Sequence, residues 1–289
     1  MSKILLGGKT EVLSLDELSM ARAETNHKGE PKYGIFPKEI LNGIAEMADK
    51  ASLNPVINQI DVTKVEFVDS PLSDKGKPIY ESKDIRLAVI KEMMGTIDFK
   101  VFESEVMGQS NIMSCGIIFT EKGIQVGFGP KVKVCSNLCI LGAGHMLKSG
   151  SRGVREMFSK GIPAMLNMSE EMFTKSVDAM QKMALKEVNL DAFAQMLGEL
   201  HLLRFITGPQ KITFDHPILT HQEYDTTPML NGDLNIFTEK SLNTFSNNPV
   251  ANMYEIYNNG TEIIKPGRVN LINLMDTNAA FTQYMVSKS

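Results

Sequence analysis

The stretch NIMSCGIIFTEKGIQVGFGPKVKV, residues 111–134, decides the fold class. Two runs within it, 112–120 and 124–128, are rich in the β-branched and aromatic residues that favour strands. Between them, Glu121-Lys122-Gly123 has the polar, glycine-containing character of a tight turn. Strands joined by so short a turn run antiparallel, so the sequence predicts a β-hairpin here.

Alternating residue types extend this hairpin into a sheet. Apolar residues at 124, 126 and 128 alternate with polar or small ones, and Lys131 and Lys133 alternate with valines. Because successive side chains of a strand point to opposite faces, we expect both lysines on the solvent face of an antiparallel sheet. Similar runs at 99–106 and 132–141 predict about four strands over roughly 99–141.

Helical periodicity dominates the second half of the chain. Apolar residues at 173, 177, 180, 184 and 188 form a stripe on one helix face, and Asn167 with Glu170 fits a helix cap. A second stripe starts at Leu190 and ends at Gly208-Pro209, and shorter helices are expected near 238–245, 250–258 and 269–285. The sequence therefore predicts an α+β fold whose sheet packs against helices from 167–207 and the C-terminal region.

The N-terminal third has a less regular pattern. Residues 1–35 are polar and broken by glycines, which predicts an arm with little core of its own. Pro37 suits the first turn of a helix, and Val62–Val68 resembles a strand. The spacing of Ile85, Val89 and Met93 predicts a further helix over 83–94. The predicted organisation is an N-terminal arm (1–35) followed by a single α+β domain (36–289).

Composition limits the classes of function. The 289 residues carry a net charge of −4, so any nucleic-acid binding must come from a local basic patch. Three cysteines are too few for a secreted disulfide scaffold, which predicts free thiols and a cytoplasmic location. No run approaches the roughly 18 apolar residues that a membrane span needs, so we expect no membrane association.

No cofactor or catalytic motif is complete. Residues 142–149, GAGHMLKS, resemble a phosphate-binding loop, but Leu147 stands where glycine is required. Residues 3–10, KILLGGKT, have Lys3 in place of the first glycine. No nucleophile elbow is present. The sequence therefore predicts no cofactor and no catalytic residue, and it favours a protein that is not an enzyme.

Two groups of residues contain side chains that can bind a metal. Cys135 and Cys139 are four residues apart, about 13 Å along a strand, which is too far for both sulfurs to share one zinc ion. The segment HPILTHQEYD contains the second group, in a composition typical of a polar surface loop: His216, His221, Glu223 and Asp225. We predict no metal site at the cysteines and leave open whether the second group binds a metal.

One segment is strongly electropositive. Over residues 131–160 six cations stand against a single acidic residue, Glu156, although the whole chain is acidic. Glycine and serine are frequent there, which lets backbone N–H groups approach phosphates. Such a segment suits a nucleic-acid backbone, and a solvated surface that balances acids elsewhere is the simpler alternative. The predicted nucleic-acid-binding residues are Lys131, Lys133, Lys148, Arg152, Arg155 and Lys160.

Three blocks carry a resemblance to known proteins: GFGPKVKVCSNLCI (127–140), FAQMLG (193–198) and NMYEIYNNGTE (252–262). In this order and spacing they resemble a bacterial and phage mobile-element family that is known as a domain of unknown function. The chain is similar, more distantly, to the phage/plasmid-like protein family. The resemblance covers roughly residues 100–285. It implies a phage or mobile-element setting and no established reaction.

Two hypotheses follow from these observations. The first is an accessory protein that binds nucleic acid, with single-stranded DNA in recombination as the expected setting, because the strand-then-helix order is loosely similar to phage annealing proteins. The second is a protein-binding module, such as an inhibitor of a host defence component or a virion-associated structural protein. For the second we expect an exposed apolar patch supplied by some of the 19 methionines. Partners are therefore DNA or a host or phage protein, and homo-oligomer formation stays open.

Overall fold

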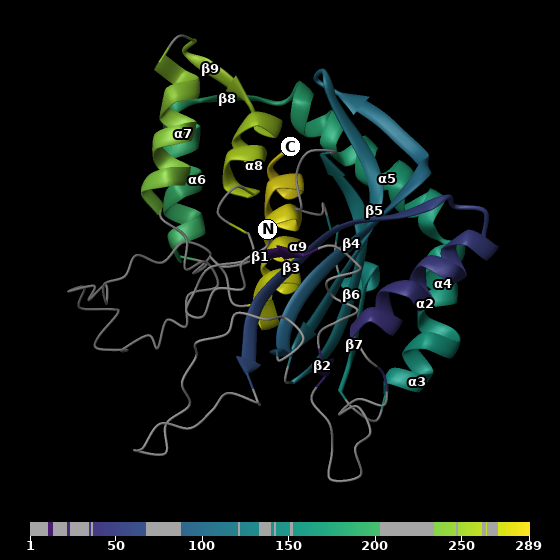
Figure 1. Cartoon of the computed structure of the whole chain (residues 1–289). Coiled ribbons are helices and arrows are strands. Elements are labelled where there is room, and N and C mark those ends of the chain that lie inside the picture. Colours follow the sequence, from purple (N-terminus) through teal and green to yellow (C-terminus); the bar gives the residue numbers. More distant parts are fainter. Residues whose placement is uncertain are drawn as a thin grey trace, which may run out of the picture. The chain divides into compact units, whose positions relative to one another are not determined.

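A computed structural model describes residues 11–13, 22–23, 35, 37–67, 88–120, 122–132, 140–141, 143–150, 153–202, 234–246, 248–261, 264 and 271–289. The chain divides into two compact units, residues 1–177 and 178–289. The chain passes from unit 1 to unit 2 within helix α5 (Ser169–Leu185). Figure 1 shows the elements of both units. The division into an arm and a single domain stays a prediction.

Unit 1 is built on a sheet of seven strands. In chain order they are β1 (Glu11–Leu13), β2 (Arg22–Ala23), β3 (Pro55–Phe67), β4 (Ala88–Val106), β5 (Gln109–Thr120), β6 (Gly123–Val132) and β7 (Met146–Ser149). Six of them follow the order β1-β3-β4-β5-β6-β7 with antiparallel pairing, and β2 pairs parallel to β4. The predicted α+β class is confirmed, with more strands than the four expected.

The predicted hairpin is confirmed as β5 and β6. Thr120 pairs with Gly123, so the turn has the predicted position. Gly123 has a φ of 155°, and a Cβ atom there would collide with the Ser149 carbonyl of β7, so a side chain is excluded. This glycine therefore allows β7 to approach the hairpin and become the next strand of the sheet.

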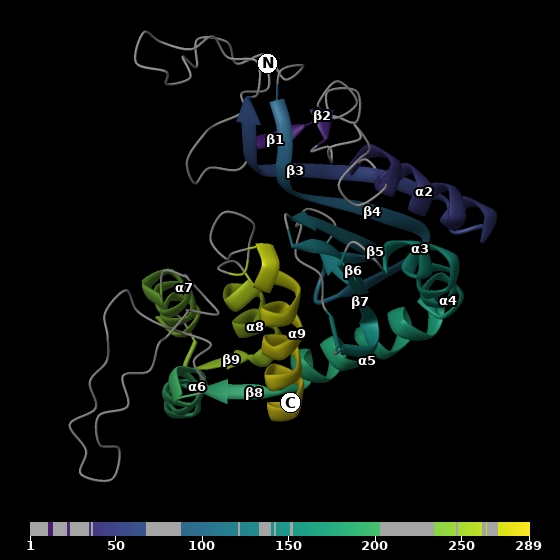
Figure 2. The ribbon, with the colours of Figure 1, turned by 90° about the horizontal axis from the view of Figure 1, so that it is seen from below.

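One face of the sheet is apolar and covered by helices (Figure 2). Ile97 and Phe99 on β4 share this face with Cys115 on β5, and all three are fully buried. The covering helices are α2 (Pro37–Lys50) and the continuous helical run of α3 (Val154–Glu156), the π-helical η3 (Met157–Gly161) and α4 (Ile162–Asn167). Leu41 of α2 lies against Gly95, and Leu147 of β7 lies against Gly161.

The opposite face of the sheet carries polar side chains that are also buried. Thr96 and Asp98 on β4, Ser114 on β5 and Lys131 on β6 each expose 6% or less of their surface. Asp98 is paired directly with Ser114. Both faces of the central strands are therefore shielded from water, which the alternation of residue types does not predict.

Two predictions of secondary structure fail in this unit. The predicted helix over 83–94 is wrong for residues 88–94, which form the first part of β4, and residues 83–87 lie outside the described part. Met93 and Met94 are buried on opposite faces, so the strand lacks alternation and its apolar spacing mimics a helix. The predicted cap at Asn167 is also wrong, because α4 continues through Asn167 and α5 begins at Ser169.

Unit 2 is helical with one small ribbon. Its helices are α6 (Leu190–Leu202), α7 (Leu234–Ser246), α8 (Met253–Thr261) and α9 (Leu271–Lys288). The predicted C-terminal helices are confirmed, except that residues 250–252 form a strand and not the start of a helix. Strands β8 (Glu187–Asn189) and β9 (Val250–Asn252) pair antiparallel just before α6 and α8. The strand predicted near Ile212–Phe214 lies outside the described residues.

Aromatic contacts and side-chain caps position these helices. Phe237 meets Phe193 and Phe281 edge-on, and Phe281 stacks on Tyr257 at 5.9 Å between ring centroids. Asn252 caps α8, because its Oδ1 accepts the Glu255 N–H while Glu255 Oε2 accepts the Asn252 N–H. The cap fixes where the ribbon ends and α8 begins.

Candidate functional site

The structure separates the six predicted cations. Lys133 and Arg152 lie outside the described residues. Three others are exposed: Lys148 on β7, Arg155 on α3 and Lys160 on η3. Lys131 lies on β6 and is 2% exposed. The expectation that Lys131 projects into solvent is wrong.

Lys131 belongs to a buried polar cluster. Its Nζ lies 3.1 Å from Asp98 Oδ1, and the side chain of Lys131 is 1% exposed against 8% for Asp98. Asp98 also accepts hydrogen bonds from Ser114 Oγ and from Asn58 Nδ2, both at 2.7 Å. Three strands, β3, β5 and β6, thus supply one group each to the carboxylate of Asp98 on β4.

The position of Lys131 follows from small neighbours on its own face. Alternation correctly places Lys131 on the face opposite Phe128 and Pro130, but that face is covered rather than wet. Ser114 and Gly129 lie opposite each other between Lys131 and Asp98. Because neither has a bulky side chain, the lysine can extend across β5 to the carboxylate on β4. The charge of Lys131 is therefore compensated internally, and its Nζ is shielded from a nucleic-acid backbone.

The three exposed cations form what we call the cationic edge: Lys148, Arg155 and Lys160. Strand β7 is an edge strand of the sheet, and Leu147 brings it against η3. Glu156 is the only acidic residue within 143–167 that the structure describes, and its carboxylate is 3.7 Å from Lys160 Nζ. Both side chains of that pair are more than 70% exposed, so it neutralises Lys160 weakly.

The cationic edge is not a flat face. Lys148 pairs with Gln125 and lies on the side of β7 opposite to Leu147, whose side chain meets η3. Arg155 and Lys160 are on the helical run that covers the other face. The cations therefore surround the border of the sheet, where a flexible chain can follow them more easily than a rigid rod.

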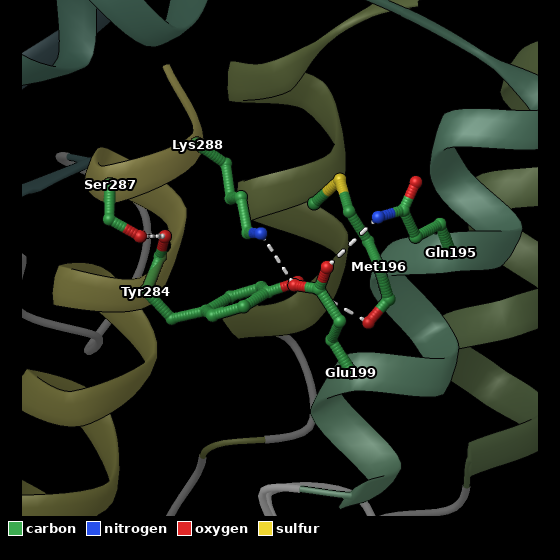
Figure 3. A network of polar contacts seen from close by, with 6 residues as sticks. All are labelled: Gln195, Met196, Glu199, Tyr284, Ser287 and Lys288. Atoms are coloured by element: carbon green, nitrogen blue, oxygen red, sulfur yellow. Dashed lines mark hydrogen bonds and ion pairs between the residues drawn. The ribbon is translucent and has the colours of Figure 1, made fainter.

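A second polar cluster lies in unit 2 and was not predicted (Figure 3). Glu199 on α6 accepts a hydrogen bond from the Tyr284 hydroxyl at 2.9 Å and lies 2.6 Å from Lys288 Nζ. Gln195 Nε2 donates to the other carboxylate oxygen at 3.2 Å. The cluster ties α6 to α9, and Lys288 also lies over the Tyr284 ring, 5.6 Å from its centroid. Its partners are 85 residues apart in sequence, which hides it from sequence patterns.

The protonation of this second cluster suits structure rather than catalysis. Burial, followed by the hydrogen bond to Glu199, raises the pKa of Tyr284 well above its ordinary value. The hydrogen bond from Lys288, followed by that from Tyr284, lowers the pKa of Glu199. A phenol that holds its proton and a carboxylate that stays ionised exchange no proton near neutral pH.

The described residues supply no activated nucleophile or metal centre. Burial raises the pKa of the Cys115 thiol far above its ordinary value, which keeps this sulfur protonated and unreactive. No group of three or more metal-ligating side chains occurs in the part of the chain that the structure describes. Cys135, Cys139 and the histidine segment 216–225 fall outside it. None of the helices within the described ranges is long and apolar enough to span a membrane.

Comparison of the chain with protein-family models, with curated proteins and with solved structures gave no match.

Proposed function

We propose that unit 1 binds the phosphate backbone of nucleic acid through the cationic edge, and that single-stranded DNA is the preferred form. The observation that supports this function is the exposure of Lys148, Arg155 and Lys160 on adjoining elements, in a described stretch, 143–167, whose one acidic residue is Glu156. Lysine and arginine bind phosphates as point charges or forked donors, and the released counterions drive binding.

The shape of the cationic edge favours a single strand. A duplex is rigid over about 150 base pairs, whereas the cations of the edge lie on both sides of β7. A single strand can bend around such a border and bring a phosphate to each cation. We propose that this binding takes place in the phage or mobile-element setting that the sequence resemblance implies.

Base stacking contributes little in this proposal. Phe158 lies between Arg155 and Lys160 in the sequence, and its ring packs against α2, 3.4 Å from where a Cβ atom on Gly43 would sit. A ring engaged in packing between helices offers no free platform for a base. Binding should therefore be insensitive to sequence and dominated by charge.

The alternative of a protein-binding module predicts an exposed apolar patch to which some of the methionines contribute. Among methionines whose side chains are described, Met107 and Met168 are exposed, at 53% and 47%, and the others are buried or half-buried. The methionine surplus therefore largely fills the core. This alternative stays a prediction.

The test is the salt dependence of binding to a labelled oligothymidylate, measured by fluorescence anisotropy. A variant with Lys148→Gln, Arg155→Gln and Lys160→Gln removes the cationic edge. Because each phosphate contact adds about 0.7 to the slope of log K against log salt for single strands, the triple variant should lose about 2 from that slope.

The matched control changes charge by the same amount elsewhere in unit 1. It carries Lys38→Gln, Lys50→Gln and Lys100→Gln, three exposed lysines on α2 and β4. The control should retain the wild-type slope. Equal losses in both variants would contradict a localised site, and a wild-type affinity that does not change with salt would exclude backbone binding.

A further inference from the structure

The two faces of the central strands are buried by different kinds of residue. We define the polar face by four buried residues that lie opposite to the apolar core of unit 1: Thr96, Asp98, Ser114 and Lys131. Their neighbours are small, because Ser114 pairs with Gly129 and Thr96 pairs with Gly116. Burial stabilises a fold in proportion to the apolar area that it removes from water. Closing the polar face therefore contributes less to stability than closing the apolar face.

Polar groups on this face have lost their contact with water. Thr96 is 1% exposed, and its Oγ1 has no hydrogen-bond partner among the residues that the structure describes. Such hydroxyl groups are rare, since burial removes their hydrogen bonds to water without replacement. Lys131 and Asp98 compensate each other, but burial has removed the hydration of both charges. Water that enters this face restores these interactions, which favours an open state.

Solvent already reaches the border of the polar face. Val56 on β3 lies directly opposite Asp98 and is 38% exposed, against 6% for Asp98. Asn58, whose Nδ2 donates a hydrogen bond to Asp98, is exposed as well. Neighbouring strands are about 4.8 Å apart, so water stops one strand away from the buried carboxylate. A small displacement is therefore enough to hydrate the cluster.

We propose that the polar face opens to water in a local event while the apolar face stays closed, and that Lys131 can bind a phosphate only in the open state. Regions with little buried apolar surface are the ones that open without global unfolding. The first part of this proposal is independent of the proposed function, and the role of Lys131 rests on it.

The position of Lys131 suits a strand that already occupies the cationic edge. Lys131 is six residues along β6 from Gln125, the partner of Lys148, which corresponds to about 20 Å. A bound single strand can span this distance, because sites of several nucleotides are usual for such proteins. A ligand that contacts Lys131 only in the open state shifts the population toward that state.

The opening is tested by the reactivity of two thiols on opposite faces of the sheet. Thr96→Cys places a thiol on the polar face, where no hydrogen bond to the described residues is lost, and the native Cys115 is the control on the apolar face. Cys135→Ser and Cys139→Ser remove the other two thiols. Labelling of each site by a maleimide is followed by peptide mass spectrometry at urea concentrations below the unfolding transition.

The thiol at position 96 should react at least about tenfold faster than Cys115 without urea. Its rate should depend weakly on urea, because local opening exposes little surface, whereas the rate at Cys115 should follow global unfolding. Equal rates with the same urea dependence at both thiols would overturn the proposal. If circular dichroism shows that Thr96→Cys does not fold, Ser114→Cys provides the same comparison on the residue next to the control.

The role of Lys131 is tested with the double variant Asp98→Leu and Lys131→Met, which has the net charge of the wild type. This variant should lose about 0.7 from the slope of log K against log salt for oligothymidylate. An unchanged slope would overturn the role of Lys131. Because the thiol experiment contains no nucleic acid, its outcome is separate from any failure of the proposed function.

Discussion

The ion pairs of Lys131 with Asp98 and of Lys288 with Glu199 join similar groups in different surroundings. The first is nearly inaccessible, with side chains 1% and 8% exposed, and the second is open to water at 37% and 28%. The second pair is the shorter one, 2.6 Å against 3.1 Å. Distance alone would suggest that the exposed pair contributes more to the stability of the fold. Burial reverses that order, because a charge left alone in the interior cannot be hydrated.

Removing one partner of the buried pair should produce the largest effect on stability. Asp98→Ala leaves Lys131 enclosed without its counter-ion, and we expect it to lower the free energy of unfolding by about 3–5 kcal/mol. Urea denaturation followed by far-ultraviolet circular dichroism measures this change, since the chain contains no tryptophan.

The control for this variant replaces both charges with apolar side chains of similar size. Asp98→Leu combined with Lys131→Met should recover most of the lost stability, because no uncompensated charge remains. The comparison fails if Asp98→Ala costs less than about 1 kcal/mol, or if the double variant is no more stable than the single one.

The Tyr284 hydroxyl should have an intermediate effect that depends on pH. Tyr284→Phe removes the hydrogen bond to Glu199, and we expect it to cost about 1 kcal/mol at neutral pH. Since the pKa of Tyr284 is raised in the fold, its contribution is complete below the ordinary pKa of 10.0 and is lost as pH rises above that value. Urea titrations at about pH 7 and about pH 11 should show the difference between wild type and variant shrinking. A constant difference would contradict this reasoning.

Lys288→Met should have the smallest effect of the three. Its partner Glu199 keeps two other hydrogen bonds, and water screens the pair, so the shift in urea midpoint should be smaller than for Tyr284→Phe. The pKa of Glu199 is lowered in the fold, chiefly by the hydrogen bond from Lys288. The advantage of the wild type should therefore be present above pH 4.5 and decrease as pH falls below it. A midpoint shift that exceeds the Tyr284→Phe shift would contradict the ranking.

Local patterns predicted much of the fold. The turn at Gly123, the helix beginning at Pro37 and the C-terminal helices follow from signals within a few residues of each other. The first part of β4 could not be predicted in this way, because a strand that is buried on both faces shows no alternation of apolar and polar residues. Strand order and the position of β7 depend on contacts between distant segments, which local periodicity does not encode.

The candidate site was predictable only in part. Exposure of Lys148, Arg155 and Lys160 agrees with the expectation from their charge. Lys131 has the same charge and a regular alternating pattern, and only the small residues at Ser114 and Gly129 and the distant Asp98 explain its burial. Because Asp98 is 33 positions earlier and on another strand, the sequence close to Lys131 does not reveal this partner.

The crossing of β5 by Lys131 also constrains how this chain can change through evolution. A mutation of Asp98 or Lys131 alone passes through a weakened protein, whereas replacement of both together does not. Homologous chains should accordingly inherit the two residues as a unit or lack both of them. Wherever both occur, position 114 should be restricted to small side chains, since a larger one would block the route of the lysine.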